Sequence, residues 1–448
     1  MSEKNLQSQE IDLTKDYDSL EPVPMEARTY NKLNMFLMWF GANAKPGNWF
    51  IGGVFGVAGL MGALFITVLG SAVAYLFNIG IGLIGFTAGI ATFAITRTVF
   101  GIRGSKIFSI LNATSFVGWC FINGIVAAKA MNAVSIATIG YDNLFVWGAV
   151  MGVLQGVSVI WGREAIRRIG TVGSAILVVA SVAICIVLMI KLPKESLLQP
   201  MSDETRSQMG ALFSMCIGVN LGWAPAAADF GRYAKDKGTA TWISYVSLLI
   251  TAALFFMTGT MGYIATGEYD PAGQFLAMGL AWPFLILIII LTVTTNVVNI
   301  YTGAMSLENA FAGKLSPRKA ILILAIIQVP LTAYYPLLGH AQTFFNYLSI
   351  IFGPLFTILI VDHYLVKKRK LIVSQLDVKE GIYWYNNGFN IGYIIIDIIG
   401  VILYLWFTHI NLLASSIGVM IPMMIIVAIL TFLYGKWQVK TGRMQLEP

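Results

Sequence analysis

Charged residues are scarce in this chain of 448 residues. Only 11% of the residues are Asp, Glu, Lys or Arg, whereas 57% are hydrophobic, and the mean hydropathy is +0.76. A soluble domain of average composition carries about 25% charged residues, and it needs them because they keep its surface in water. The shortage of charge therefore excludes a soluble enzyme, a disordered tail protein and a nucleic-acid-binding protein.

Cysteine is also rare, and histidine equally so, with three residues of each type. All three cysteines lie in apolar runs without a Cys-x-x-Cys pair: Cys120, Cys185 and Cys216. This pattern argues against a disulfide framework and against a zinc site. No HExxH, GxxxxGK[ST] or GxSxG motif is present, so we expect no enzyme and no catalytic residues. The polar N-terminus lacks the apolar stretch of a cleaved signal peptide.

Long apolar segments fill most of the chain. A helix needs about 20 apolar residues to cross about 30 Å of hydrocarbon, and backbone that faces lipid must be helical because no water is there to bond it. The sequence therefore predicts an all-α integral membrane protein. We expect twelve transmembrane helices, at residues 33–58, 61–88, 107–133, 143–162, 169–192, 207–231, 240–266, 273–303, 317–335, 342–366, 388–408 and 412–435.

The basic residues are distributed unevenly between the two ends of these predicted helices. An even number of helices places both termini on one side, and 24 of the 29 Lys and Arg residues fall on that side. Positive charge marks the cytoplasmic side, so we expect a multi-pass protein of the cytoplasmic membrane with cytoplasmic tails at 1–32 and 436–448. The net charge of +7 then reflects topology and contact with anionic lipid. Nucleic acid is not expected as a partner.

Two of the predicted helices contain residues that interrupt a helix. The first reads WFGANAKPGNWFIGG over 39–53, and the sixth reads GVNLGWAPAAADFG over 218–231. Each has a Gly-x-Asn motif followed by a proline: Gly41, Asn43 and Pro46 in the first, and Gly218, Asn220 and Pro225 in the sixth. Breaks at membrane depth are tolerated where they line a cavity enclosed by protein. Matching breaks five helices apart are typical of an inverted-repeat transporter, and a pair of ordinary proline kinks is the alternative.

Polar side chains gather in two further helices. The eighth contains TVTTNVVNIYTG, and helical spacing puts four of its polar residues on one face: Thr292, Thr295, Asn296 and Asn299. Such oxygens suit a desolvated alkali cation, while hydrogen bonding between helices is the alternative. In the third helix Trp119 and Asn123 share a face. They suit a planar heterocycle, although the tryptophan could equally serve packing.

Two charged residues lie within predicted helices. Lys45 stands beside Pro46 in the first, and Asp397 lies in the eleventh. Charge inside the membrane is usually functional. Lys45 is therefore a candidate for sensing protons, for contacting substrate or for occupying space near a cation site, since snorkelling is awkward at its depth. For Asp397 the simpler interpretation is pairing with a neighbouring helix.

Several short motifs follow one another in a specific order. They are PVPxxAR at 22–28, RxxFGxxGS at 97–105, GW at 118–119, DFxRYA at 229–234, TTN at 294–296, and the stretch from GP at 353–354 to DxY at 362–364. In these motifs the chain resembles the nucleobase–cation symporter-1 family, which includes cytosine permease, the hydantoin transporter, and permeases for allantoin, purines and thiamine precursors. The resemblance covers almost the whole chain.

The resemblance implies a LeuT-like core of two inverted five-helix repeats. The repeats would be 33–192 and 207–366, and the two additional helices would occupy 388–435. The resemblance also implies a sodium site made of three backbone carbonyls and two hydroxyls: Gly41, Ala44, Leu291, Thr294 and Thr295. A substrate would stack on Trp119 and hydrogen-bond to Asn296. The further residues expected around the substrate are Asn43, Asn123, Asn220, Gly222, Trp223 and Asn299.

Four positions depart from the pattern of the family. Asn220 stands where the family has an aromatic stacking partner, so a ring would be stacked on one side only unless Trp223 replaces that partner. Phe116 replaces a glutamine of cytosine permease, and Ala228 replaces a proline. Lys45 follows the inferred sodium ligand Ala44, where its charge would repel sodium at low dielectric. These departures leave Na⁺ and H⁺ open as the coupling cation, with Lys45 as the coupling candidate.

The sequence therefore predicts a secondary active transporter. We expect it to import a nucleobase of the cytosine or purine type, or a related planar heterocycle, coupled to Na⁺ or H⁺ by alternating access. The alternatives are a thiamine-precursor, allantoin or other heterocycle permease of the same family, and an amino-acid or amine–cation symporter with the same core fold. A membrane enzyme or a sensor is less favoured because neither a convergent catalytic set nor a soluble output domain is evident. We expect no cofactor besides the coupling cation, and no obligate protein partner.

Overall fold

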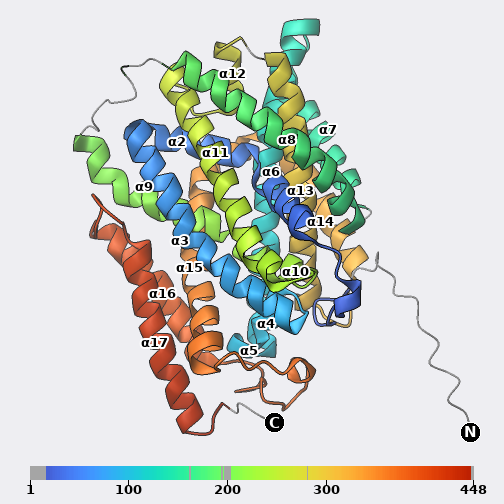
Figure 1. Ribbon diagram of the computed structural model, residues 1–448, viewed down its shortest axis with the longest axis vertical. Helices are drawn as coiled ribbons and strands as arrows, with labels where there is room; N and C mark the ends of the chain where they lie inside the picture. Colours follow the sequence, from blue (N-terminus) through green and yellow to red (C-terminus); the bar gives the residue numbers. More distant parts are fainter. Residues whose placement is uncertain (1–16, 161–162, 193–194, 196–202, 280, 445–448) are drawn as a thin grey trace, which may run out of the picture.

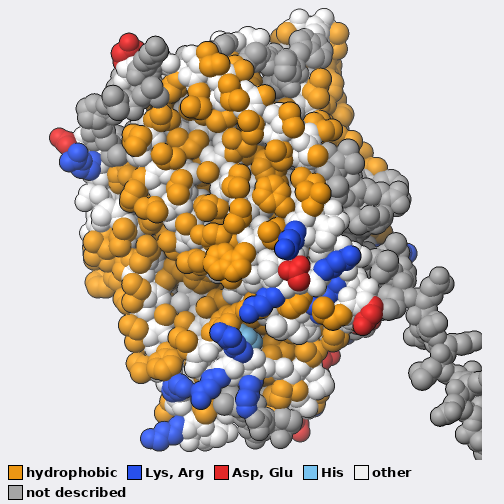
Figure 2. All heavy atoms as spheres, in the orientation of Figure 1, with side chains coloured by type: hydrophobic (Ala, Val, Ile, Leu, Met, Phe, Trp, Pro, Cys, Tyr) orange, Lys and Arg blue, Asp and Glu red, His pale blue; other side chains and the backbone are white. Residues whose placement is uncertain are grey.

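The computed structural model describes residues 17–160, 163–192, 195, 203–279 and 281–444 (Figure 1). This part of the chain is a bundle of helices that contains no β-strand. Figure 2 shows a broad band of hydrophobic side chains across the bundle, with Lys and Arg gathered toward the end where α4, α5 and the last turns of α17 lie. A soluble monomer rarely exposes an apolar patch beyond a few hundred Å², so this band is the surface of a membrane protein.

The segments predicted as the first repeat are helical. Their helices are α1 (Lys32–Asn43), α2 (Pro46–Phe55), α3 (Gly59–Ala88), α4 (Thr92–Ile95), α5 (Arg97–Phe100), α6 (Ile102–Ile139), α7 (Leu144–Ser158) and α8 (Arg163–Lys191). The first predicted helix is thus split into α1 and α2. The short α4 and α5 turn the chain before it enters the long α6.

The segments predicted as the second repeat, and the two predicted helices after it, are also helical. Their helices are α9 (Asp203–Leu221), α10 (Ala224–Gly231), α11 (Ser244–Thr266), α12 (Pro271–Ala277), α13 (Ala281–Ala310), α14 (Pro317–Ala333), α15 (Ala341–Val361), α16 (Ile391–His409) and α17 (Met420–Lys440). The sixth predicted helix is split into α9 and α10. In the interior α6 and α13 pack along each other, and α16 and α17 pack on α15 at the edge of the bundle (Figure 1).

Two predicted boundaries were wrong. The segment 273–303 holds the short α12 and then α13, separated at Gly279, whose φ of 72° suits a glycine. The segment 412–435 begins with turns, and α17 starts only at Met420 because Asn411, Leu413 and Gly418 also adopt positive φ. Turns of this kind depend on local contacts that hydropathy does not report.

Length and composition identify eight segments of the described chain as able to cross a membrane. Among the remaining helices, α1 stops at the break, and α7 and α14 have 15 and 17 residues. In the 29-residue α8, the apolar part that is described runs only from Ser174 to Ile190. The all-helical membrane fold is therefore confirmed, while the number of twelve spans stays a prediction.

Buried polar contacts hold the basic end of the bundle together. Arg97 donates from Nε to Asn309 and pairs with Asp377. Arg232 donates to the backbone carbonyls of Asp18 and Tyr17 at 2.8 and 3.0 Å. These hydrogen bonds and one ion pair join five distant parts of the chain at this end, and the motif residues Arg97 and Arg232 make them.

Glycines let α2 and α11 touch along their backbones. A Cβ on Gly52 would lie 2.1 Å from the carbonyl oxygen of Phe256, and a Cβ on Gly259 would lie 2.0 Å from that of Trp49. Helices in membranes associate through such small residues because lipid offers no hydrophobic driving force. The second half of the broken first helix is fixed in place by this contact.

Replacing Gly259 by alanine should therefore separate α2 from α11. We expect Gly259→Ala to destabilise the protein by about 1–3 kcal/mol through overpacking, measured as a lower unfolding temperature of the purified protein in detergent. Gly339→Ala is the control, because nothing lies within 4 Å of a Cβ at that exposed glycine. Equal unfolding temperatures for the two variants would contradict the tight contact.

Candidate functional site

The two predicted helix breaks are present in the structure. Between α1 and α2, Ala44 (φ −75°, ψ 84°) and Lys45 (φ −134°, ψ 148°) leave the helical conformation. Pro46 then starts α2, where its missing N–H costs nothing. Between α9 and α10, Gly222 and Trp223 form a turn before Pro225 in the first turn of α10. The Gly-x-Asn motif with a following proline thus located both breaks correctly.

One hydrogen-bonded network joins the two breaks. The amide of Asn43 donates to the hydroxyl of Tyr75 and to the carbonyl of Leu248, both at 3.0 Å. Its oxygen accepts from the indole N–H of Trp223 at 2.9 Å. The Tyr75 hydroxyl in turn donates to Asn220. Asn43 and Asn220, both predicted as substrate residues, are thereby engaged with the protein itself, and they fix one break against the other. Tyr75 of α3 was not predicted, because nothing in its own sequence context marks it.

The side chain of Lys45 lies against two tryptophans. Its Nζ is 3.4 Å from the centroid of the Trp119 ring and 4.9 Å from that of the Trp223 ring. Only 2% of Lys45 is exposed. The structure therefore brings Trp119 of α6 and Trp223 of the second break together around the first break, as the sequence analysis allowed, and an ammonium group stands over both rings.

Glycines at both breaks make room for Trp119. A Cβ on Gly47 would lie 3.1 Å from Cζ3 of Trp119, and a Cβ on Gly222 would lie 3.5 Å from its Nε1. Trp119 also contacts Phe344 and Phe345 of α15, with ring centroids 5.7 and 5.2 Å away. These two phenylalanines were missed, since aromatic pairs in an apolar helix carry no distinctive signal.

A chain of side-chain amides runs beside Trp119. The backbone N–H of Gly47 donates to Oδ1 of Asn123 at 3.0 Å, and Asn123 donates to Oδ1 of Asn296 at 3.1 Å. Asn299 donates to the same oxygen at 2.8 Å, and Asn296 donates to Oε1 of Gln155 at 2.7 Å. The predicted residues Asn123, Asn296 and Asn299 are thus brought together. Gln155 was missed, although a lone amide in the apolar α7 was a usable signal.

Two atoms of this amide chain have hydrogen-bonding capacity left. Oδ1 of Asn299 and Nε2 of Gln155 are buried and have no partner in the described part of the structure. Buried polar groups are normally satisfied, so an unpaired acceptor and an unpaired donor in the same amide chain are available to a bound molecule. Nucleobases and related rings present complementary N–H and C=O groups at their edges.

The predicted sodium ligands lie where α13 meets the first break. The hydroxyl of Thr295 donates to the carbonyl of Ala42, in the chain between Gly41 and Ala44. The hydroxyl of Thr294 instead donates within its own helix, to the carbonyls of Ile290 and Leu291. Thr295 therefore bridges α13 and α1, while Thr294 does not.

Ser174 of α8 faces the same stretch of α1. A Cβ on Gly41 would lie 2.0 Å from Ser174 Oγ, and this buried oxygen has no partner in the described residues. Ser174 was not predicted, because a single serine in an apolar helix is unremarkable. Carbonyl and hydroxyl oxygens are the ligands that an alkali cation uses. The donor set therefore fits Na⁺, and an unpaired buried hydroxyl supports that fit.

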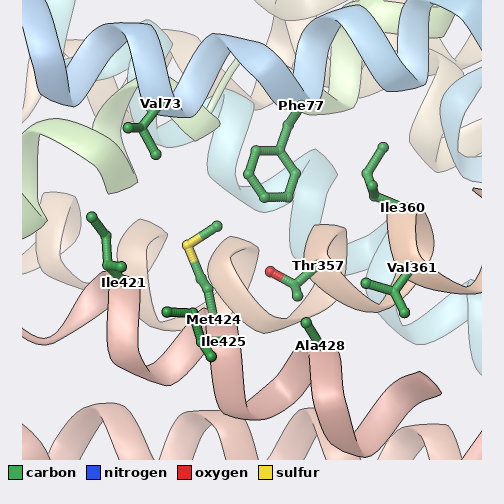
Figure 3. A pocket seen from close by; sticks show the side chains of 9 residues that line it. All are labelled: Val73, Phe77, Thr357, Ile360, Val361, Ile421, Met424, Ile425 and Ala428. Carbon is green, nitrogen blue, oxygen red and sulfur yellow. The ribbon is translucent and has the colours of Figure 1, made fainter. Parts of the chain in front are cut away.

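Two other features lie away from this site. Asp397 of α16 is buried, and its Oδ1 has no partner in the described part of the chain. An apolar hollow of about 410 Å³ is lined by residues of α3, α15 and α17 (Figure 3). Its one polar lining residue, Thr357, donates to the Gly353 carbonyl of its own helix at 2.7 Å. The hollow therefore offers nothing to hold a polar ring.

The chain is similar to known permeases. The family model described as "permease for cytosine/purines, uracil, thiamine, allantoin" matches residues 22–430. The hydantoin permease of Microbacterium maritypicum is 26% identical over 66% of this chain and 64% of its own length, so the match spans slightly less than two thirds of that relative. The cytosine permease of Escherichia coli K12 is 26% identical over 78% of this chain and 81% of its own.

The fold is similar to that of a solved transporter. Mhp1, a nucleobase-cation-symport-1 family transporter in a closed conformation with bromovinylhydantoin bound, superposes with a TM-score of 0.80 over 98% of both chains at 18% identity. Its inward-facing conformation gives 0.77 at 19% identity. At such identities the likeness concerns the fold, and it confirms the expected LeuT-like architecture.

Removing the amide at the centre of the amide chain should destabilise the folded protein. Asn296→Ala leaves buried groups of Asn123, Asn299 and Gln155 without a partner, and each such loss costs about 1–3 kcal/mol. We expect a clearly lower unfolding temperature in detergent. Asn132→Ala is the control, since this asparagine of α6 makes only exposed hydrogen bonds, to Asp142 and to the backbone of Asn143. If the unfolding temperature of Asn296→Ala is no lower than that of the control, Asn296 does not hold the chain of amides together.

Proposed function

We propose that this chain is a secondary active transporter for a planar heterocycle. It belongs to the family of permeases for cytosine, purines, uracil, thiamine and allantoin. It imports a nucleobase or a related ring across the cytoplasmic membrane, together with Na⁺ or H⁺, and changes no covalent bond of the substrate. The arrangement of Trp119 beside the amide chain, at the point where both broken helices meet, is the observation that carries this proposal.

The substrate ring stacks on Trp119 in this proposal. An indole offers a flat apolar face, and the glycines at positions 47 and 222 leave that ring in contact with both breaks. The edge of the substrate bonds to the amide chain, where Oδ1 of Asn299 and Nε2 of Gln155 are unpaired. Trp223 and Asn220 shape the site from the second break. Asn43 bonds to Trp223 directly and to Asn220 through Tyr75.

The coupling cation binds between α1 and α13 in this proposal. The carbonyls of Gly41, Ala44 and Leu291 and the hydroxyls of Thr294 and Thr295 are its ligands. A cation held there links the first repeat, 33–192, to the second, 207–366, and favours the outward-open state. Substrate binding at mid-membrane then lets the two repeats rock against each other and open the site inward.

The gathering of Lys and Arg at one end of the bundle supports the proposed orientation (Figure 2). Positively charged ends face the cytoplasm, so both tails are cytoplasmic in this proposal. The contacts of Arg97 and Arg232 then lie at the inner mouth of the transporter, where they close it.

Uptake into proteoliposomes tests the substrate class. Purified protein should drive uptake of at least one radiolabelled ring from a panel of cytosine, uracil, hypoxanthine, hydantoin, allantoin and a thiamine-precursor pyrimidine, when a Na⁺ or H⁺ gradient is imposed. Trp119→Ala should lose about tenfold or more of its affinity, since stacking on one aromatic ring contributes about 1–3 kcal/mol per base. Trp406→Ala, at a tryptophan of α16 that is 54% exposed, should behave as wild type. Uptake of leucine with none of the rings would reject the substrate class.

The two threonines separate the proposed cation site from ordinary helix packing. Thr295→Val keeps the shape and removes the hydroxyl that reaches α1, so the cation concentration for half-maximal uptake should rise by about tenfold, the value of one polar contact. Thr114→Val, at an exposed threonine of α6 bonded within its own helix, should leave it unchanged. An unchanged cation dependence in Thr295→Val would remove Thr295 from the cation site.

A further inference from the structure

Lys45 is a buried lysine without a counter-charge in the described part of the chain. Its side chain makes no hydrogen bond or ion pair there, and its Nζ lies over the two tryptophan rings. The ion pairs of the described residues lie elsewhere: Arg97 with Asp377, Lys129 with Asp270, and Lys367 with Asp362. Lys367, which is also buried among the described residues, has the carboxylate of Asp362 against it, and Lys45 has none.

A cation in this position requires compensation. Removing an ammonium group from water is costly, and buried charges are normally paired. Contact with the face of an indole offsets part of this desolvation free energy, but it does not replace a counter-ion. The helix α2 begins directly after Lys45, and the positive end of its dipole adds to the positive potential at the break. Lysine and helix terminus together favour a negative charge at this point.

The ammonium also occupies the place where a ring would stack. Its Nζ stands 3.4 Å from the centroid of Trp119, which is about the spacing of stacked rings. A ligand that stacks on Trp119 must displace it. The four-carbon stem of lysine is flexible, so the ammonium can move from the face of Trp119 to the edge of the incoming ring and stay in the site.

We propose that the substrate is an anionic planar heterocycle, whose negative charge pairs with the Lys45 ammonium while its ring stacks on Trp119. The charge is a ring carboxylate or an ionised ring N–H. This inference rests on the proposed transport function and narrows its substrate class. It accounts for a lysine that a neutral nucleobase would leave unpaired in the closed site.

The same pairing links the substrate to the coupling cation. Ala44, a proposed cation ligand, precedes Lys45 in the chain, so the free ammonium raises the energy of a cation bound nearby. A bound anion cancels that repulsion. Substrate and cation then increase each other's affinity by the same factor, and Lys45 acts as the coupling element through the substrate it holds.

Matched pairs of rings test the charge directly. Equilibrium binding of radiolabelled uracil and uracil-6-carboxylate, and of hypoxanthine and urate, is measured on the full-length protein in detergent. We expect wild type to bind the better anion about 30-fold or more tightly than its neutral partner, the usual effect of completing a buried charge pair. Lys45→Gln should remove this preference, and Lys45→Arg should keep most of it. Lys129→Gln, at a lysine with its own carboxylate, is the matched control and should keep all of it.

The outcomes separate the two proposals. If wild type binds uracil or hypoxanthine as tightly as the carboxylate or urate, the charge pairing is wrong and the transport function stands. If no ring of either kind binds or is taken up, both proposals fail. A preference for anions that survives in Lys45→Gln would assign the charge recognition to another residue and overturn the role of Lys45. If Lys45→Gln does not fold, the ratio of anion affinity to neutral-ring affinity is compared between wild type and Lys45→Arg, and this comparison still tests the charge pairing.

Discussion

A broken helix in a bilayer leaves backbone groups that lipid cannot bond, and this fold depends on how the protein meets that constraint. The solution is to set the two breaks against each other. Asn43 bonds to Trp223 across them, and Tyr75 connects Asn43 to Asn220. The same arrangement gathers groups that are rare in this chain, namely free amide edges and a cation. The proposed binding site is thus a consequence of satisfying two interrupted helices in one place.

Much of this arrangement could be predicted, because membrane-spanning helices are mostly apolar and their few polar or helix-breaking residues are easy to recognise. Against an apolar background, Gly41, Asn43 and Pro46 stand out, and so do their counterparts around Asn220, so both breaks were located correctly. Asn123 and Asn296 were recognised for the same reason, and they bond to each other. The five-helix spacing of the breaks indicated an inverted-repeat transporter, and the family resemblance carried by the motifs implied the LeuT-like core. Because polar residues are rare in these helices, each one is a useful indication of a helix break or a candidate site.

The parts that could not be predicted depend on contacts between distant segments. Ser174 and Tyr75 look ordinary in their own helices, and only the packing of α8 and α3 on the breaks gives them a role. Two residues of the same type can also have different roles that only the three-dimensional structure distinguishes. Thr295 reaches α1, whereas Thr294 bonds its own helix. Asn220 is predicted to lie near the substrate, and only the structure shows that its amide also bonds to Tyr75, Ser71 and Cys216.

The buried cations show how structural and functional charge can be told apart. Arg97 and Lys367 each lie against a carboxylate, and Arg97 also donates to Asn309. Arg232 donates to two backbone carbonyls, although its Nε has no partner in the described residues. These contacts stabilise one arrangement of the basic end. Lys45 has only aromatic faces, which attract a cation without fixing its position. In the proposed transport cycle, the two repeats move against each other, and the Lys45 ammonium exchanges an indole face for an anion. The lack of a partner, more than the presence of charge, is what led us to propose Lys45 as the residue through which a ligand acts on the fold.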